Sequence, residues 1–216
     1  MDSPPFNVIF GLAVLLLLFG GPIFGWIWWS RAQNRSYNEK LNILAERFGL
    51  SPVSGQNLKS EWLQVEGTYR GFPLLIGGEV EPHLYPNSAT GVTMGAKMIV
   101  PESTVESLTI AKNHRINRLT LAIKKIDSGN SVADQAALFL CSAPEIVPAL
   151  FCGEQAGRVS RLWLKGGTYR ALTLAEEKLC FNESAYFRPK LDVEIFINAV
   201  ELMAGIAEHI RPPNRQ

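Results

Sequence analysis

Histidine and cysteine, the side chains that most often bind metals or act as nucleophiles, are few and scattered in this chain. The histidines are His83, His114 and His209. No two of them have a spacing that would let one helix or strand hold a metal ion. The cysteines are Cys141, Cys152 and Cys180, each in an apolar stretch and none in a Cys-x-x-Cys pair. Isolated cysteines of this kind are usually small buried side chains. We therefore expect neither a metal site nor cysteine-based catalysis.

Other catalytic motifs are also missing from the sequence. The stretch 91–97 has two glycines before Lys97, but it has the wrong spacing for a phosphate-binding loop and no Ser or Thr after the lysine. The paired acids at 79/81 and 176/177 lie in polar, turn-like segments, where carboxylates are solvated. No catalytic residue and no cofactor are predicted. A membrane-bound enzyme stays a second alternative, because catalytic residues scattered along the chain escape a motif search.

Basic residues gather in one part of the chain. Between Ser107 and Ile126 there is no acidic residue, and the basic ones are Lys112, Arg115, Arg118, Lys124 and Lys125. Near an anionic lipid surface each well-placed Lys or Arg contributes about 1 kcal/mol of attraction. We treat them as candidates for contact with an anionic surface or a partner. The competing interpretation is a solvated strand, whose alternation would send these side chains to both faces of a sheet.

A second candidate contact lies in the loop 81–87, where two prolines flank His83 and Tyr85. Rigid loops with exposed aromatic residues are typical of binding surfaces. A plain connection between two strands is the alternative.

The N-terminal region has the strongest pattern in the sequence. Residues 8–29 include no charged side chain and have no polar helical face. As a helix they would extend about 33 Å, which matches a hydrocarbon core of about 30 Å. A cleavable signal peptide would need basic residues first and a small-x-small exit, but Asp2 precedes the segment and tryptophans end it. We predict an uncleaved transmembrane helix.

Flanking charges predict the orientation of this helix. No Lys or Arg precedes it, whereas Arg31 and Arg35 follow directly, so the positive-inside rule places the following side in the cytoplasm. Trp26, Trp28 and Trp29 would then lie at the cytoplasmic headgroup level. The expected localisation is the cell membrane, single-pass, with residues 1–7 outside. Gly21 and Gly25 form a small-x-x-x-small pair, so a homo-oligomer stays open.

The rest of the chain is long enough for one domain with its own core. A juxtamembrane segment, residues 30–51, either continues the membrane helix or begins a new helix at the capping-box pattern Ser36-x-x-Glu39. Residues 52–216 form the expected cytoplasmic domain. There, alternating apolar residues predict strands in these ranges: 62–69, 72–77, 92–100, 105–111, 116–126, 136–141, 159–165, 168–174 and 178–181. The range 136–141 also fits a helix, and we favour a strand because a new helix starts just after it.

Two helices are expected among these strands. A short one begins near Ser142 and reaches about Phe151, and an amphipathic one covers 191–210. The predicted fold class is α+β: a largely antiparallel sheet with a helix before it and a C-terminal helix packed on it. The tetrapeptide Gly-Thr-Tyr-Arg occurs at 67–70 and again at 167–170. The repeat is either a trace of an internal duplication or a coincidence, because Thr-Tyr suits any strand.

Composition narrows the functional class. The 216 residues carry a formal charge of +1, which excludes a generally basic nucleic-acid binder, so no nucleic-acid partner is expected. Short polar ends without low-complexity tails are typical of a bacterial protein. The leading hypothesis is a membrane-anchored cytoplasmic binding module, an accessory or assembly component whose partners are the lipid bilayer and a protein. The alternative is a ligand- or lipid-sensing domain at the inner membrane surface that uses the sheet as its binding site.

Overall fold

The computed structural model describes residues 21–53, 64–78, 92–112, 126–164, 169–185 and 191–212. The chain divides into two compact units, Met1–Glu39 and Lys40–Gln216, and each is considered by itself. The strand expected over 116–126 lies outside the described residues, apart from Ile126 at its end.

Helix α2, Gly21–Phe48, is one unbroken helix. Ser36 lies in its interior, so the new helix start that the capping-box pattern allowed is wrong. Neither Pro nor Gly interrupts residues 30–48, and nothing therefore breaks the hydrogen-bond ladder there. The helix ends at Gly49, which has a φ of 68° and lets the amide of Leu50 donate to the carbonyl of Ala45 at 2.8 Å.

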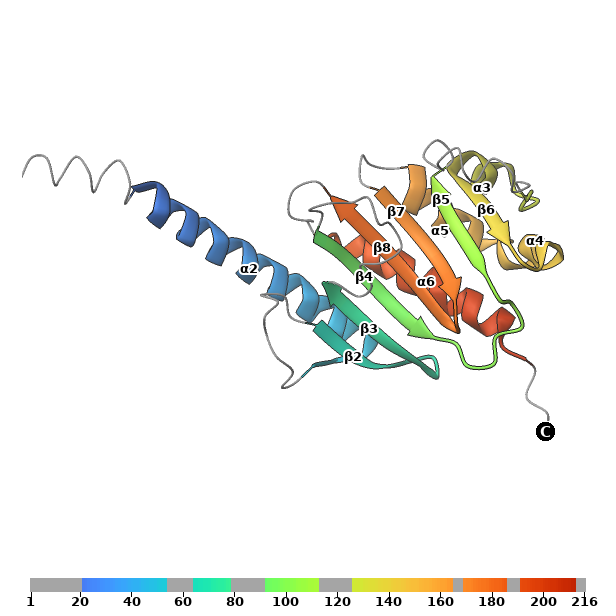
Figure 1. The fold of residues 1–216 in the computed structure, drawn as a ribbon, viewed down its shortest axis with the longest axis horizontal. Helices are drawn as coiled ribbons and strands as arrows, with labels where there is room; N and C mark the ends of the chain where they lie inside the picture. The colour runs from blue at the N-terminus through green and yellow to red at the C-terminus, as the bar shows by residue number, and fades with distance from the viewer. Residues whose placement is uncertain are drawn as a thin grey trace, which may run out of the picture. The chain divides into compact units, whose positions relative to one another are not determined.

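Among the described residues of the second unit, eight strands form a single antiparallel sheet (Figure 1). They are β1 Ser51–Pro52, β2 Gln64–Tyr69, β3 Phe72–Gly78, β4 Val92–Ile99, β5 Leu108–Lys112, β6 Ala137–Cys141, β7 Tyr169–Ala175 and β8 Lys178–Ala185. Their order in the sheet is β1-β2-β3-β4-β8-β7-β5-β6. The β2–β3 hairpin turns at Arg70 and Gly71, as predicted, with φ values of 50° and 82°. Two positive φ angles match the twist of a two-residue hairpin.

The remaining helices follow clear start signals. They are α3 Ser131–Ala136, the 3₁₀ turn η4 Pro144–Ile146, α4 Val147–Leu150, α5 Glu154–Leu164 and α6 Val193–Ile210. The carboxylate of Asp192 accepts from the amides of Glu194 and Ile195, and Asn130 caps α3 in the same way. The expected helix over 191–210 and the short helical stretch after Ser142 are both confirmed.

One expected strand is wrong: residues 159–165 belong largely to helix α5. The short window Val159–Lys165 contains closely spaced apolar residues that suit either structure. Over the longer stretch the buried residues are Ala156, Val159, Leu162 and Trp163, which share one helical face. The helical period therefore shows only when the residues before Val159 are included.

The two faces of the sheet differ in what they contact. The row Ile110–Leu172–Phe181–Ala96–Ile76 runs across neighbouring strands and is fully buried. Phe181 from this row lies 5.6 Å from Phe196 of α6, and helices α5 and α6 lie behind the sheet in Figure 1. Within the second unit, the last turns of α2 also join this face, where Phe48 meets Tyr69 at 4.9 Å.

The structure therefore confirms an α+β fold with an antiparallel sheet and the C-terminal helix α6 packed on it. Its core is a two-layer one, because the apolar face of the sheet and the apolar faces of the helices bury each other.

Candidate functional site

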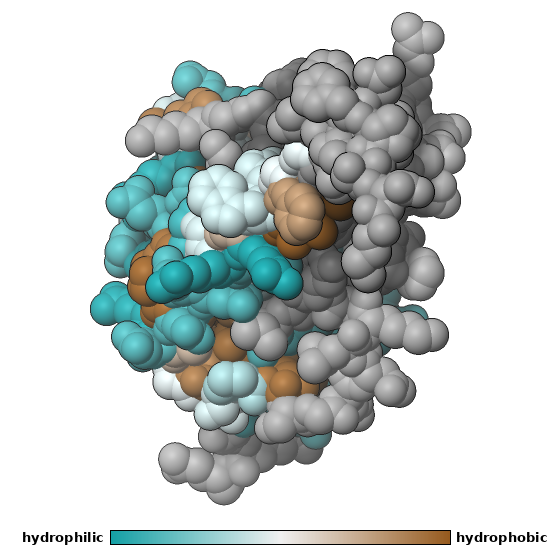
Figure 2. Space-filling view, turned by 90° about the vertical axis from the view of Figure 1, so that its left-hand side faces the viewer, coloured by the Kyte–Doolittle hydropathy of each residue, from teal (hydrophilic) through white to brown (hydrophobic). Residues whose placement is uncertain are grey.

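The first turns of α2 expose an unusual number of large apolar side chains. They are Ile23, Phe24, Trp26, Ile27, Trp28 and Trp29, with exposed fractions between 41% and 75%. In Figure 2, brown and near-white side chains are visible beside teal, hydrophilic ones on the face shown. A soluble helix normally keeps one polar face, whereas these residues point around the helix in all directions. We call Ile23–Trp29 the aromatic segment.

Three of the predicted membrane-interface residues belong to the aromatic segment. The rings of Trp26 and Trp29 are 5.6 Å apart. Arg31 and Arg35 follow on the same helix, and Arg35 Nε donates to Glu39 Oε1 at 3.1 Å. The structure thus places all five residues within four helical turns. Among the residues described, no helix is both long enough and apolar enough to cross a membrane.

Most of the other predicted contact residues lie outside the described residues. Lys112 is the last residue of β5 and is half-buried. Outside the described residues lie Arg115, Arg118, Lys124 and Lys125 of the basic stretch, and also His83 and Tyr85 of the loop. The basic surface and the contact loop therefore stay predictions.

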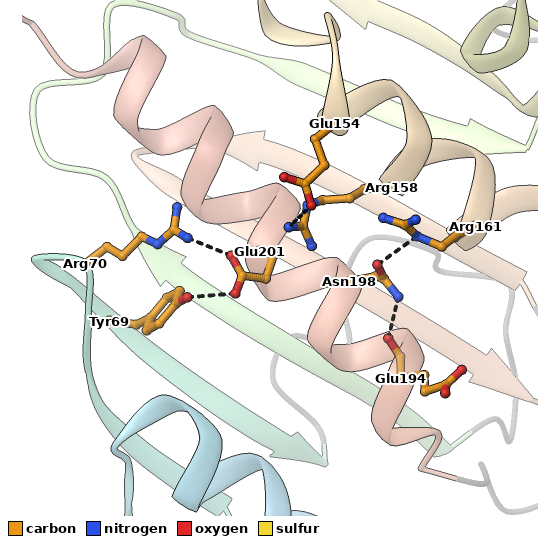
Figure 3. Close-up of polar contacts among 8 residues, drawn as sticks. All are labelled: Tyr69, Arg70, Glu154, Arg158, Arg161, Glu194, Asn198 and Glu201. Atoms are coloured by element: carbon orange, nitrogen blue, oxygen red, sulfur yellow. Dashed lines mark hydrogen bonds and ion pairs between the residues drawn. The ribbon is translucent and has the colours of Figure 1, made fainter.

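A polar cluster at Glu201 connects the β2–β3 hairpin with α6 (Figure 3). Glu201 is only 8% exposed. Tyr69 Oη donates to its Oε1 and Arg70 Nη2 to its Oε2, both at 2.9 Å. Arg70 Nη1 also lies 3.5 Å from Glu208 Oε1, about two helical turns further along α6. The buried carboxylate is therefore compensated by a phenol and a guanidinium from one turn.

The cluster shifts the acid–base properties of its members. The pKa of Tyr69 is raised above its usual 10.0, first by burial and then by the hydrogen bond to Glu201. The pKa of Arg70 is also raised: burial is the largest single effect and lowers it, but Glu201, Tyr69 and Glu208 together outweigh that burial. Both residues consequently stay protonated at neutral pH, which is the state that the two hydrogen bonds need.

A second ion pair lies inside the core, between neighbouring strands. Arg170 of β7 and Glu183 of β8 are register partners, and Arg170 Nη2 lies 2.8 Å from Glu183 Oε1. Both side chains are less than a tenth exposed. Arg170 Nη1 also donates to the carbonyl of Leu162, and Trp163 Nε1 donates to the carbonyl of Arg170. This pair attaches the last turn of α5 to the sheet.

Polar contacts also join α5 to α6 on the outer surface of the helices (Figure 3). Arg161 Nε donates to Asn198 Oδ1 at 3.0 Å, and Asn198 Nδ2 donates to the carbonyl of Glu194 at 2.8 Å. Arg158 pairs with Glu154 within α5 at 2.7 Å. These exposed contacts orient the two helices and add little stability each.

The histidine and cysteine residues that the structure describes have ordinary surroundings. His209 Nδ1 lies 2.9 Å from the carbonyl of Gly205, in the last turn of α6 as predicted. Cys180 is buried, Cys141 half-buried and Cys152 exposed. Within the described ranges no three His, Cys, Asp or Glu residues are grouped so that they could hold a metal ion.

Sequence reasoning missed both buried glutamates, Glu183 and Glu201. A signal was present in the repeated word Gly-Thr-Tyr-Arg, because Arg70 and Arg170 each pair with one of them. The two copies differ in position, however: Tyr69 ends strand β2, whereas Tyr169 begins strand β7. The shared feature is an arginine that neutralises a buried acid, from the hairpin turn in the case of Arg70 and from strand β7 in the case of Arg170.

Comparison with known proteins gives no relative from which a role could be transferred: no protein-family model, curated protein or solved structure matches the chain. Any function must therefore be argued from the residues themselves.

Proposed function

We propose that this protein is a membrane-anchored binding module, whose sheet-and-helix domain faces the cytoplasm and serves as an accessory or assembly component of a membrane-associated process. The observation that carries the proposal is the aromatic segment. It supplies six large exposed apolar side chains directly after the uncharged residues 8–20 and directly before Arg31 and Arg35.

The free energy of the aromatic segment is lower in lipid than in water. Removing a large apolar side chain from water contributes about 1.5–3 kcal/mol, so six partly exposed ones amount to a contribution on the order of 10 kcal/mol. Tryptophan also prefers the boundary between headgroups and hydrocarbon, where its ring is apolar and its N–H stays hydrated. Residues 26–29, in which three of four residues are tryptophan, therefore suit the end of a bilayer span better than a solvated helix.

The basic residues that follow the aromatic segment support the proposed orientation of the helix in the membrane. Arg31 and Arg35 lie on the helix just beyond the tryptophans, which is where the positive-inside rule places basic residues on the cytoplasmic side. The role as a binding module follows from this tether. A domain held at the bilayer by a continuous helix meets membrane-associated partners at a raised effective concentration.

Alkaline carbonate extraction of membranes tests the anchor. The unaltered chain should stay in the pellet, because a spanning helix is not removed by high pH. Replacing Leu15, Leu16 and Leu17 together by arginine should release the protein, since each central arginine costs about 2.5–3.5 kcal/mol in the bilayer. The matched control is Ile43→Arg with Val132→Arg, which places arginine at two exposed apolar positions outside the segment. Release of the unaltered chain by carbonate would contradict the anchor.

Crosslinking in native membranes tests the binding role separately. A photoreactive residue at exposed Leu164 or at Val132 should give reproducible adducts with a membrane-associated protein. The L15R/L16R/L17R variant, freed from the membrane, should lose most of that yield. Adducts with lipid alone would contradict the role in assembly while leaving the anchor intact.

A further inference from the structure

Helix α2 has one face on which aromatic side chains are followed by basic ones. This face is formed by Phe24, Trp28, Arg31 and Arg35, whose spacing of four, three and four residues aligns them along the helix. Phe24 and Trp28 are the two most exposed large apolar residues among those described, at 73% and 75%, and the side chain of Arg35 is 84% exposed. We call these four residues the aromatic–basic stripe.

The surface beside the aromatic–basic stripe is open. Gly25 and Ala32 lie on the same side of the helix as Trp28, and both are exposed. A Cβ atom added at Gly25 would meet nothing within 4 Å. A long molecule can therefore lie along the helix, against the ring of Trp28, without displacing any part of the protein.

The two arginines of the stripe differ in their charge compensation. Arg35 Nε donates to Glu39 Oε1 at 3.1 Å, so its charge is partly neutralised. Arg31 is exposed, and within the described part of the chain it forms no ion pair or hydrogen bond. It lies about 4.5 Å further along the helix axis than Trp28, which is less than one turn. If tryptophan marks the boundary between hydrocarbon and headgroups, Arg31 is at the level of the lipid phosphates.

We propose that the aromatic–basic stripe binds an anionic phospholipid, with an acyl chain along Phe24 and Trp28 and the phosphate at the guanidinium of Arg31. A guanidinium matches a phosphate with two parallel hydrogen bonds. In a zwitterionic lipid the cation of the headgroup already compensates the phosphate, so the site should prefer a lipid without that cation. The inference rests on the proposed membrane anchor and adds to it the class of lipid that the aromatic segment recognises.

Quenching of tryptophan fluorescence by brominated phospholipids tests the proposal. The full-length chain carries Trp26→Phe and Trp29→Phe, so that Trp28 is the tryptophan left in the aromatic segment. It is reconstituted in phosphatidylcholine vesicles that contain the same mole fraction of either brominated phosphatidylglycerol or brominated phosphatidylcholine. Brominated phosphatidylglycerol should occupy the site about fivefold more readily, the factor that corresponds to the roughly 1 kcal/mol that one basic side chain contributes near an anionic lipid surface.

Variants in the same background separate the site from a general attraction by positive charge. Arg31→Gln should abolish the preference. Arg47→Gln, which lowers the net charge equally at an exposed arginine outside the stripe, should keep it, and so should Arg35→Gln with Glu39→Gln, which removes the compensated pair. Equal quenching by the two lipids before these changes, a preference that survives Arg31→Gln, or an equal loss in Arg47→Gln would overturn the proposal and leave the anchor intact. Quenching by neither lipid would mean that Trp28 is outside the bilayer, which would contradict the anchor and the proposal together.

Discussion

Arg170 is a single buried residue that connects several structural elements of this fold. Its guanidinium contacts Glu183 on the neighbouring strand and the carbonyl of Leu162 at the end of α5, and its own carbonyl accepts from Trp163. One buried side chain thus joins two strands and a helix. A buried pair of this kind contributes modestly as a pair, but losing one partner leaves a charge without compensation.

We therefore predict that Arg170→Met lowers the free energy of unfolding by about 3–5 kcal/mol, because Glu183 would stay buried without its partner. Arg170→Met with Glu183→Leu should recover most of that loss, since neither charge remains. Urea denaturation followed by tryptophan fluorescence measures both. An equal loss of unfolding free energy in the single and the double variant would show that the Arg170–Glu183 pair does not govern stability.

Reactivity of the three thiols should follow their surroundings. Burial raises the pKa of Cys141, which lowers its thiolate fraction at neutral pH, and Cys180 is inaccessible. Cys152 is exposed and should be the first to react with a maleimide, with Cys141 slower and Cys180 modified only after unfolding. Peptide mass spectrometry of a time course checks the order. Early modification of Cys180 would contradict the burial.

Among the structural elements, the β2–β3 hairpin and α6 depend on each other through Glu201. Tyr69 and Arg70 come from the hairpin end, and both bond the same carboxylate. The order of these elements in the sequence gives no sign that residues 69 and 201 meet, so this link could not be predicted.

Tyr69→Phe should cost about 1.5–3 kcal/mol at neutral pH, the usual range for a hydrogen bond to a charged group. The pKa of Tyr69 is raised in the fold, so its stabilising contribution is complete below pH 10 and is lost as the pH rises through the folded pKa. The stability difference between the unaltered chain and Tyr69→Phe should therefore be constant from pH 7 to 9 and shrink above pH 10. A difference that grows in alkali would contradict the assigned proton.

The elements that sequence reasoning found share a strong local signal. The α6 helix has a capping Asp192 and an apolar stripe, and the β2–β3 hairpin has Arg70-Gly71 between alternating strands. The α5 helix was missed because a short window around Val159 fits both periods. Strand order was beyond reach, because β8 pairs with β4 and β7 with β5 through contacts that close long loops. The Arg70–Glu201 pair was missed for the same reason, because its two residues are 131 positions apart in the sequence.

At the scale of the whole molecule, helix α2 precedes a two-layer domain that consists of one antiparallel sheet and the helices packed on it. The helices cover one face of the sheet through apolar packing. Helix α2 is continuous from Gly21 to Phe48, and its last turns contribute the core residues Leu41, Leu44 and Phe48.

The exposed thiol of Cys152 allows a direct measurement of the side of the membrane on which the domain lies. A membrane-impermeant maleimide is added to intact cells that express the full-length chain, and then to inside-out vesicles from the same cells. We predict no labelling of the intact cells and ready labelling of the vesicles, with Cys152→Ser removing most of the vesicle signal. Labelling of Cys152 in intact cells would place the domain on the opposite side of the membrane, and recovery of the protein in the soluble fraction would contradict the anchor itself.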